Sequence, residues 1–338
     1  MRMTALRGRL GSNERGGTIV FIAVCLVVIL GMVALVVDVG GELVMRRRMV
    51  NAADAGALAA ALSCAKGLPD EAPGQADSFA TQNVGGATRD SYSADNCGGI
   101  GSGSVTVKYH ATVPRFFAEI LGFTPTQDVA ATAKAIWQPS VGAIVIPVEM
   151  STQNGIVPCI TQQIGTECNY WHDQGNLDLP NDSDWGFMNL GEQWDVRADA
   201  SCHDPGAGNL RRWIHTGLHV SLDPSGTTYV CVSQGFEDST WLGALNHERG
   251  QLKTFPVNDP ATMIRTQGNA KYSIIGFSSL VIEAVLPGNT AAALSKCPGH
   301  APDSNAVCVV GLWEGFQVGG DEGSGGSDQG LRTIRLSG

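Results

Sequence analysis

The longest apolar stretch of the chain covers residues 18–37, TIVFIAVCLVVILGMVALVV, and contains no charged side chain. An α-helix of this length rises by about 30 Å, which matches the hydrocarbon thickness of a lipid bilayer. A cleaved secretory signal is the alternative. The run is longer than a usual signal core, however, and no small-x-small cleavage motif precedes Asp38. We therefore expect a single transmembrane helix.

The apolar stretch continues without a turn signal into an alanine-rich segment that reaches about Ser63 and contains no proline. This composition favours an uninterrupted helix. One face carries mostly small residues at helical spacing, which allow another backbone to approach closely. This seam consists of Met45, Met49, Ala52, Ala53, Gly56, Ala59 and Ala60. Its periodicity fits packing either on the rest of the chain or on a partner subunit.

Alternating apolar and polar positions predict strands at residues 105–113 and 129–137. Between them, FFAEIL at residues 116–121 is apolar enough for one or two helical turns, closed by Gly122. Residues 64–138 are therefore expected to form a small α+β module.

Residues 139–338 contain several runs of branched and aromatic residues bounded by turn formers, which predict a mostly β region. One helix is expected at about residues 209–219, because Leu210, Trp213 and Ile214 fall on one apolar arc. The predicted fold class is α+β: a single transmembrane helix continuing into an extracytoplasmic helix, followed by a β-rich, disulfide-supported ectodomain. Its expected divisions are a lead at residues 1–17, the anchor and helical extension at 18–63, the small module at 64–138 and the β-rich ectodomain at 139–338.

Charge differs between the anchor region and the rest of the chain. The first 50 residues contain seven Lys and Arg against three Asp and Glu, whereas the whole chain has a net charge of −10. The segment beyond the anchor is thus strongly acidic. Nucleic-acid binding requires a basic patch that meets the phosphates, so we exclude nucleic acid as a partner.

Nine cysteines are present, and Cys25 lies within the apolar stretch. The other eight are Cys64, Cys97, Cys159, Cys168, Cys202, Cys231, Cys297 and Cys308. The absence of a CxxC motif argues against zinc-ribbon and thioredoxin-like sites and favours disulfides. We expect each cysteine to pair with its neighbour along the chain, with buried free thiols as the alternative.

The orientation of the helix follows from the cysteines, because basic residues flank both ends of the apolar stretch and the positive-inside rule does not decide. Disulfides persist in oxidising compartments. The expected location is therefore the cell membrane, single-pass, with residues 1–17 cytoplasmic and the C-terminal domain extracytoplasmic.

The N-terminal region combines several motifs in a fixed order. These are ERG at residues 14–16, the apolar stretch, DVG at 38–40, three arginines at 46–48 and NAADAGALAAA at 51–61. In order, spacing and residue type this region resembles the N-terminal domain of the TadE/TadG-like proteins of bacterial Flp (tight adherence) pilus assembly. The resemblance implies a non-enzymatic accessory or minor structural component of a pilus or related secretion apparatus, with other Tad or pilin-like subunits docking through the N-terminal helix.

Histidine motifs for a metal ion are incomplete. His215 and His219 have the HxxxH spacing that places two imidazoles on one helix face, with His203 and His172 as further candidate ligands. The Glu that zincins add to this pair is missing. His247 begins a sequence like HExxH, but position 251 is Gln. We therefore predict a polar helix face and no metal.

The other candidate binding and catalytic motifs are incomplete or have a structural explanation. Asp173, Asp178, Asp182 and Asp184 lie in a polar loop whose oxygens would suit calcium, but EF-hand spacing is absent and turn formation is the preferred explanation. DPSG at residues 223–226 predicts a hairpin turn. GFSSL at residues 276–280 lacks the second glycine of a nucleophile elbow. We expect no catalytic residue and no cofactor.

Three other functions suit an anchored ectodomain. An adhesin or carbohydrate-binding protein could use the seven tryptophans, although no periodicity gathers them on one face. A pilin-like subunit released by a peptidase would be cut near residues 16–17, but the following segment lacks the Glu that pilins usually carry at the fifth position. An anchored hydrolase would need a nucleophile or metal constellation that these motifs do not provide.

Overall fold

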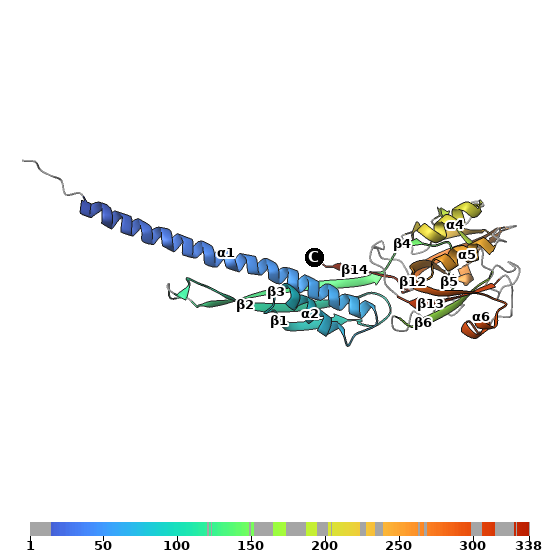
Figure 1. The fold of residues 1–338 in the computed structure, drawn as a ribbon, viewed down its shortest axis with the longest axis horizontal. Helices are drawn as coiled ribbons and strands as arrows, with labels where there is room; N and C mark the ends of the chain where they lie inside the picture. Colours follow the sequence, from blue (N-terminus) through green and yellow to red (C-terminus); the bar gives the residue numbers. More distant parts are fainter. Residues whose placement is uncertain are drawn as a thin grey trace, which may run out of the picture.

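The computed structural model describes residues 15–119, 122, 124–148, 150–151, 165–173, 187–194, 202–203, 205–223, 228–233, 239–262, 264–266, 269–298, 306–314, 328 and 330–337. The molecule is elongated. A long helix, α1 (Arg15–Ala65), extends from one end, and two β-sheets follow along the long axis (Figure 1). The predicted α+β class is confirmed.

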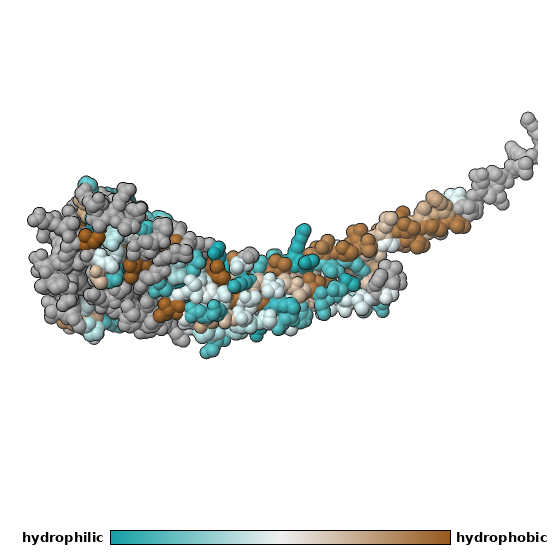
Figure 2. All heavy atoms as spheres, turned by 180° about the vertical axis from the view of Figure 1, so that it is seen from behind, coloured by the Kyte–Doolittle hydropathy of each residue, from teal (hydrophilic) through white to brown (hydrophobic). Residues whose placement is uncertain are grey.

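Helix α1 runs for 51 residues without a break and ends two residues beyond the expected Ser63. Its N-terminal half exposes large apolar side chains, which appear as a brown stretch on the face seen in Figure 2, and its most apolar window has a mean hydropathy of 3.4. By length and composition this half could cross a membrane. The helix stops where Gly67 adopts a positive φ of 74° and donates its N–H to the carbonyl of Cys64.

The first sheet lies along the C-terminal half of α1, has the strand order β1-β2-β3-β14 and is antiparallel throughout. Its strands are β1 (Thr88–Asp95), β2 (Gly103–Pro114), β3 (Thr126–Pro139) and β14 (Arg332–Leu336). The helices α1 and α2 (Ala72–Asn83) share a hydrophobic core with one face of the sheet. Every second residue of β2 from Val105 to Val113 is buried, which confirms the predicted alternation. We call these elements the proximal module.

The second sheet is built around β12 (Asn269–Pro287), the longest strand, in the order β5-β10-β12-β13-β6, with β9 and β11 also pairing with β12 and β7 pairing with β9. Its other strands are β5 (Met150–Ser151), β6 (Glu167–Asp173), β7 (Phe187–Trp194), β9 (Thr228–Ser233), β10 (Leu252–Asn258), β11 (Ile264–Thr266) and β13 (Ala306–Trp313). A separate pair consists of β4 (Gly142–Val145) and β8 (Leu218–Ser221). Together with the helices below, these strands form the distal module.

Three α-helices and one 3₁₀ turn, η2 (Pro260–Thr262), accompany the distal sheet among the described residues. Helices α4 (Ala207–Thr216) and α5 (Ser239–His247) contribute to its main core, whereas α6 (Ala291–Lys296) covers a smaller core. Leu210, Trp213 and Ile214 are buried on α4, as the apolar arc predicted.

The last strand, β14, belongs to the proximal sheet, where it pairs with β3, although the sequence placed it within residues 139–338. The chain crosses between the two sheets at Leu331, whose N–H bonds to the carbonyl of Phe277 and whose carbonyl accepts from Ser140. The next residue, Arg332, donates to Asp328 at 2.6 Å and to the carbonyl of Ala65 at 2.9 Å. The end of α1 and the end of the distal module are thus joined at one point.

Three disulfides have both of their cysteines among the described residues, and each joins cysteines that are neighbours along the chain. Their Cα–Cα distances are 4.4 Å for Cys64–Cys97, 5.6 Å for Cys202–Cys231 and 5.9 Å for Cys297–Cys308. The first lies in the proximal module and the other two in the distal module. The fourth expected pair includes Cys159, which lies outside the described residues.

The expected helical turns at residues 116–121 fall at the tip of the β2–β3 hairpin, where Ile120 and Leu121 lie outside the described residues. Phe116, Phe117 and Ala118 form a turn, and Glu119 has 3₁₀ geometry. Gly122 adopts a positive φ of 79° and donates its N–H to the carbonyl of Glu119 at 3.0 Å, so it closes this turn as expected.

Candidate functional site

Most of the helical seam packs inside the proximal module. Met49, Ala52, Ala53 and Ala60 are fully buried against the sheet and α2. A Cβ atom at Gly56 would lie 3.0 Å from the carbonyl oxygen of Ala76 and 3.1 Å from the Tyr109 ring. At these positions the small residues therefore allow close packing within the subunit.

Tyr109 is held firmly at the seam. Its hydroxyl donates to Asp77 at 3.0 Å, and burial together with this hydrogen bond raises the pKa of the phenol well above its ordinary value. Tyr109 therefore stays neutral and acts as a packing residue.

One seam residue, Ala59, and its neighbours instead line an open groove between α1 and α2, with a volume of about 560 Å³. The groove is lined by Ala55, Leu58, Ala59, Leu62, Ser63, Lys66, Leu68, Glu71, Gln75 and Phe79. Phe79 is 45% exposed on the α2 side. The groove is mainly apolar, and Lys66 and Glu71 are its charged residues. A surface of this kind suits the packing of a helix from another protein.

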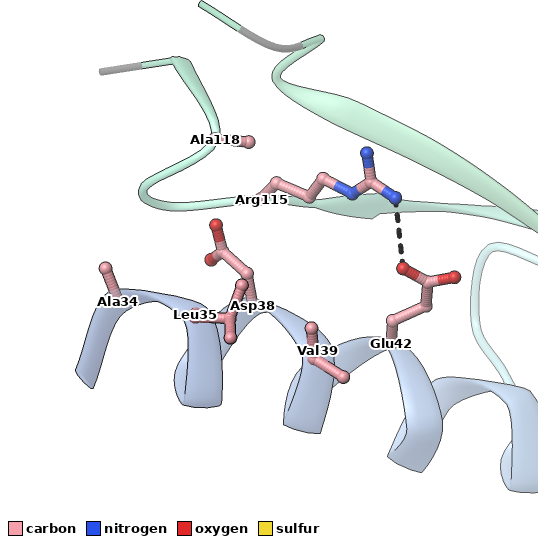
Figure 3. A pocket seen from close by; sticks show the side chains of 7 residues that line it. All are labelled: Ala34, Leu35, Asp38, Val39, Glu42, Arg115 and Ala118. Atoms are coloured by element: carbon pink, nitrogen blue, oxygen red, sulfur yellow. Dashed lines mark hydrogen bonds and ion pairs between the residues drawn. The ribbon is translucent and has the colours of Figure 1, made fainter. Parts of the chain in front are cut away.

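A second contact region forms where the apolar half of α1 ends (Figure 3). Asp38 and Glu42 lie one turn apart on α1 and face the hairpin tip. The carboxylate of Asp38 accepts hydrogen bonds from the backbone N–H groups of Phe116 at 2.9 Å and Phe117 at 3.1 Å. Arg115 donates to Glu42 at 3.0 Å. The contacts of Asp38 and Glu42 fix the hairpin tip to α1 at the first charged residues after the apolar stretch.

The same junction includes the end of the apolar stretch itself. Ala34, Leu35 and Ala118 line a small cavity of about 140 Å³ beside Asp38 and Arg115. Ala34 is only 8% exposed, whereas the side chains of the large apolar residues around it are exposed. The hairpin tip therefore covers α1 one turn beyond Asp38, toward the N-terminus.

The distal module contains a cluster of ionisable side chains. Glu248, at the end of α5, is nearly buried and contacts the Nδ1 atom of His215 from α4. The Nζ atom of Lys253 lies 2.6 Å from its other oxygen, and His247 lies 3.5 Å away. Burial raises the pKa of Glu248, but hydrogen bonds from Lys253 and His215 outweigh this effect and lower it below the ordinary value.

The ligand atoms of His215, His247 and Glu248 lie close enough together to hold a metal ion. Lys253, however, already places a positive charge on the Glu248 carboxylate, which opposes a second cation there. The geometry is that of an ion-pair network that ties α4, α5 and β10 together.

The HxxxH spacing does not place His215 and His219 on one helix, because the expected helix over residues 209–219 is shorter at its C-terminal end. Helix α4 ends at Thr216, where Gly217 follows with a positive φ of 69°, and His219 lies in β8 opposite Ile144. His203 is also separate, with its carbonyl accepting from Asn189. The side chain of His172 lies outside the described residues.

The remaining motifs have structural roles or lie outside the description. Of the aspartate loop, Asp173 pairs in β6, while residues 178, 182 and 184 are not among the described residues. DPSG was expected to form a hairpin, but β8 and β9 on either side pair with different strands. GFSSL lies in the middle of β12, where Ser278 and Ser279 are buried.

The sequence motifs did not identify the Asp38 junction or the Glu248 cluster. The i, i+4 spacing of Asp38 and Glu42 directly after an uncharged stretch was a signal for the first. The second had no local signal, because its members come from three separate elements.

The described structure is that of an α+β protein whose first helix is long and apolar enough to span a bilayer. Within this class, residues 16–63 match the family described as "Putative Flp pilus-assembly TadE/G-like". The chain thus carries an N-terminal TadE/G-like domain, which covers almost the whole of α1 and a small part of the 338 residues. No curated protein and no solved structure matches the chain.

Proposed function

We propose that this protein is a non-enzymatic accessory or minor structural component of a Tad/Flp-type pilus assembly or related secretion apparatus. The TadE/G-like match on α1 is the observation that carries the proposal. The structure supports a scaffold role, because the ionisable cluster in the distal module is an internal ion-pair network.

The proposal includes single-pass anchorage in the cell membrane, with the N-terminus in the cytoplasm. Two observations support it. The large apolar side chains of residues 18–37 are exposed, as in a helix surrounded by lipid, and the disulfides beyond them suit an oxidising compartment.

Other Tad or pilin-like subunits are proposed to contact the groove between α1 and α2. The buried face of α1 is occupied by the proximal sheet, whereas Leu58, Ala59 and Phe79 are accessible along the groove. Its apolar lining suits a helix presented by a second subunit.

A photo-activated crosslinking residue at Leu58, introduced in the native host, tests this surface. We expect a covalent adduct with another subunit of the apparatus, identified by mass spectrometry, and far less adduct from the same residue at the exposed Thr112 on β2. Equal adducts at both positions would contradict the groove. Normal surface pili and normal secretion after deletion of the gene would contradict the role in assembly.

The alternative of a carbohydrate-binding surface receives little support. Trp137, Trp171, Trp213 and Trp313 are all buried, so these four of the seven tryptophans cannot stack on a sugar.

A further inference from the structure

We propose that the tip of the β2–β3 hairpin inserts the Phe116 side chain into the acyl–headgroup boundary of the membrane that α1 crosses. The protein would then hold the bilayer at two points, one spanning and one interfacial. The inference rests on the proposed anchorage, but it is independent of any role in a pilus.

The position of the hairpin tip along the axis of α1 supports this insertion. Phe116 and Phe117 donate their N–H groups to Asp38, the first charged residue after the apolar stretch. Ala118 lines the same cavity as Ala34, which lies one helical turn further into that stretch. A turn corresponds to about 5 Å along the helix. The tip therefore reaches past the end of the apolar stretch, to a depth where a spanning helix is surrounded by lipid.

The composition of the tip suits that depth. Phe116 is 72% exposed and no part of the described structure covers its ring. The sequence from residue 116 to residue 123, FFAEILGF, is apolar at six of its eight positions. Aromatic and aliphatic side chains concentrate at membrane interfaces, where the ring leaves water while nearby polar groups stay hydrated.

Several polar groups near the tip are already paired, which lowers the cost of bringing them close to lipid. Asp38 accepts two backbone N–H groups, and Arg115 bonds to Glu42. The N–H of Arg115 also closes the hairpin by bonding to the carbonyl of Pro125 at 2.8 Å. A tip with unpaired N–H groups could not enter the boundary without losing their hydration.

The expected lipid is zwitterionic. Glu119 is exposed beside Phe116 and is the one charged side chain from residue 116 to residue 127. A single carboxylate is repelled by anionic headgroups and remains hydrated between phosphatidylcholine headgroups. The apolar contact, and not charge, would therefore hold the tip at the surface.

Spin labels on the full chain test this proposal in phosphatidylcholine vesicles that contain no other protein. Three variants are made in a Cys25→Ser background: Phe116→Cys at the tip, Val27→Cys in the apolar stretch, and Ala130→Cys, which is exposed on β3 further from the tip. Collision rates with oxygen, which enters lipid, are compared with those of a water-soluble nickel complex.

We expect the oxygen-to-nickel ratio at position 116 to be several-fold higher than at position 130 and closer to that at position 27. A ratio at 116 equal to that at 130, with 27 in lipid, would overturn the insertion and leave the anchorage intact. This outcome would also arise if a partner protein, absent from the vesicles, were the true occupant. A water-like ratio at 27 would overturn the anchorage and the insertion together.

Discussion

The two halves of α1 belong to one continuous helix, yet they use hydrophobic residues in opposite ways. Residues 18–37 carry Leu, Ile, Val and Phe, which are exposed, whereas the half from Met49 onward is mostly alanine and is buried. Apart from the hairpin tip at Ala34 and Leu35, no part of the described structure covers the more apolar half, and the less apolar half forms the core of the proximal module.

The difference shows that side-chain size, and not hydropathy, separates the two environments. Large side chains suit a helix that meets only lipid, because nothing needs to approach its backbone. Alanine and glycine allow a sheet and a second helix to pack closely on α1, as Gly56 does against Ala76 and Tyr109. Four substitutions test this contrast, beginning with the largest expected effect.

Arg332→Ala should unfold the end of the buried half. Arg332 and Asp328 are both about 95% buried, and the guanidinium also caps the carbonyl of Ala65 at the end of α1. Loss of one partner leaves a buried carboxylate uncompensated, so we expect the free energy of unfolding to fall by about 3 to 5 kcal/mol. Urea unfolding in detergent, followed by tryptophan fluorescence, measures this change. Arg335→Ala, at an exposed position of the same strand, is the control, and equal midpoints for the two variants would contradict the prediction.

Val27→Arg should weaken membrane insertion by about 3 kcal/mol, because a charge in the bilayer centre is costly. Val50→Arg is the matched control, since the two valines are 68% and 45% exposed on the same helix and differ in the proposed surroundings. The fraction of protein that resists alkaline extraction from membranes reports the effect. An equal decrease in the extraction-resistant fraction of both variants would show that the two halves of α1 do not differ in their surroundings.

Gly56→Leu should destabilise the proximal module by about 1 to 3 kcal/mol, because the added side chain overpacks the seam. Gly31→Leu should be neutral, since nothing lies within 4 Å of a Cβ atom at that position. Thermal unfolding of the two variants in detergent makes the comparison. A matching decrease in Tm for both would argue against close packing as the reason for small residues.

Asp38→Ala should have the smallest effect, about 1 kcal/mol, through the loss of its hydrogen bonds to the hairpin tip. Hydrogen exchange at the amides of Phe116 and Phe117 should become faster, while the rest of β2 stays protected. Asp70→Ala, at an exposed position, provides the baseline for exchange, and unchanged protection at the tip would disprove the contact.

The sequence predicted the features that depend on local periodicity. The apolar stretch and the alternation in β2 and β3 follow from side chains a few residues apart, and both lie where the pattern placed them. The same pattern did not show that residues 116–119 form the tip of a hairpin, because the pairing of β2 with β3 is not a local feature. The groove and the Asp38 junction depend on how elements meet, which periodicity does not encode.

The pairing of strands that are far apart in the sequence could not be predicted either. Nothing in LRTIRL distinguishes an edge strand of the distal sheet from the strand that joins β3, because either position would accept alternating side chains. The contact of His215 with Glu248 likewise joins residues that no motif connects, and the HxxxH pattern pointed to His219 instead.

The placement of β14 has a consequence for the order of events during synthesis. Strand β3 ends at Pro139, but its partner is completed only at Leu336, after the whole distal module has been made. The proximal sheet must wait with one edge open while the intervening domain emerges and folds, since loop closure over such a distance is slow. In the terms of nascent-chain biology, the distal module is an insertion whose folding controls when the domain beside the anchor can close.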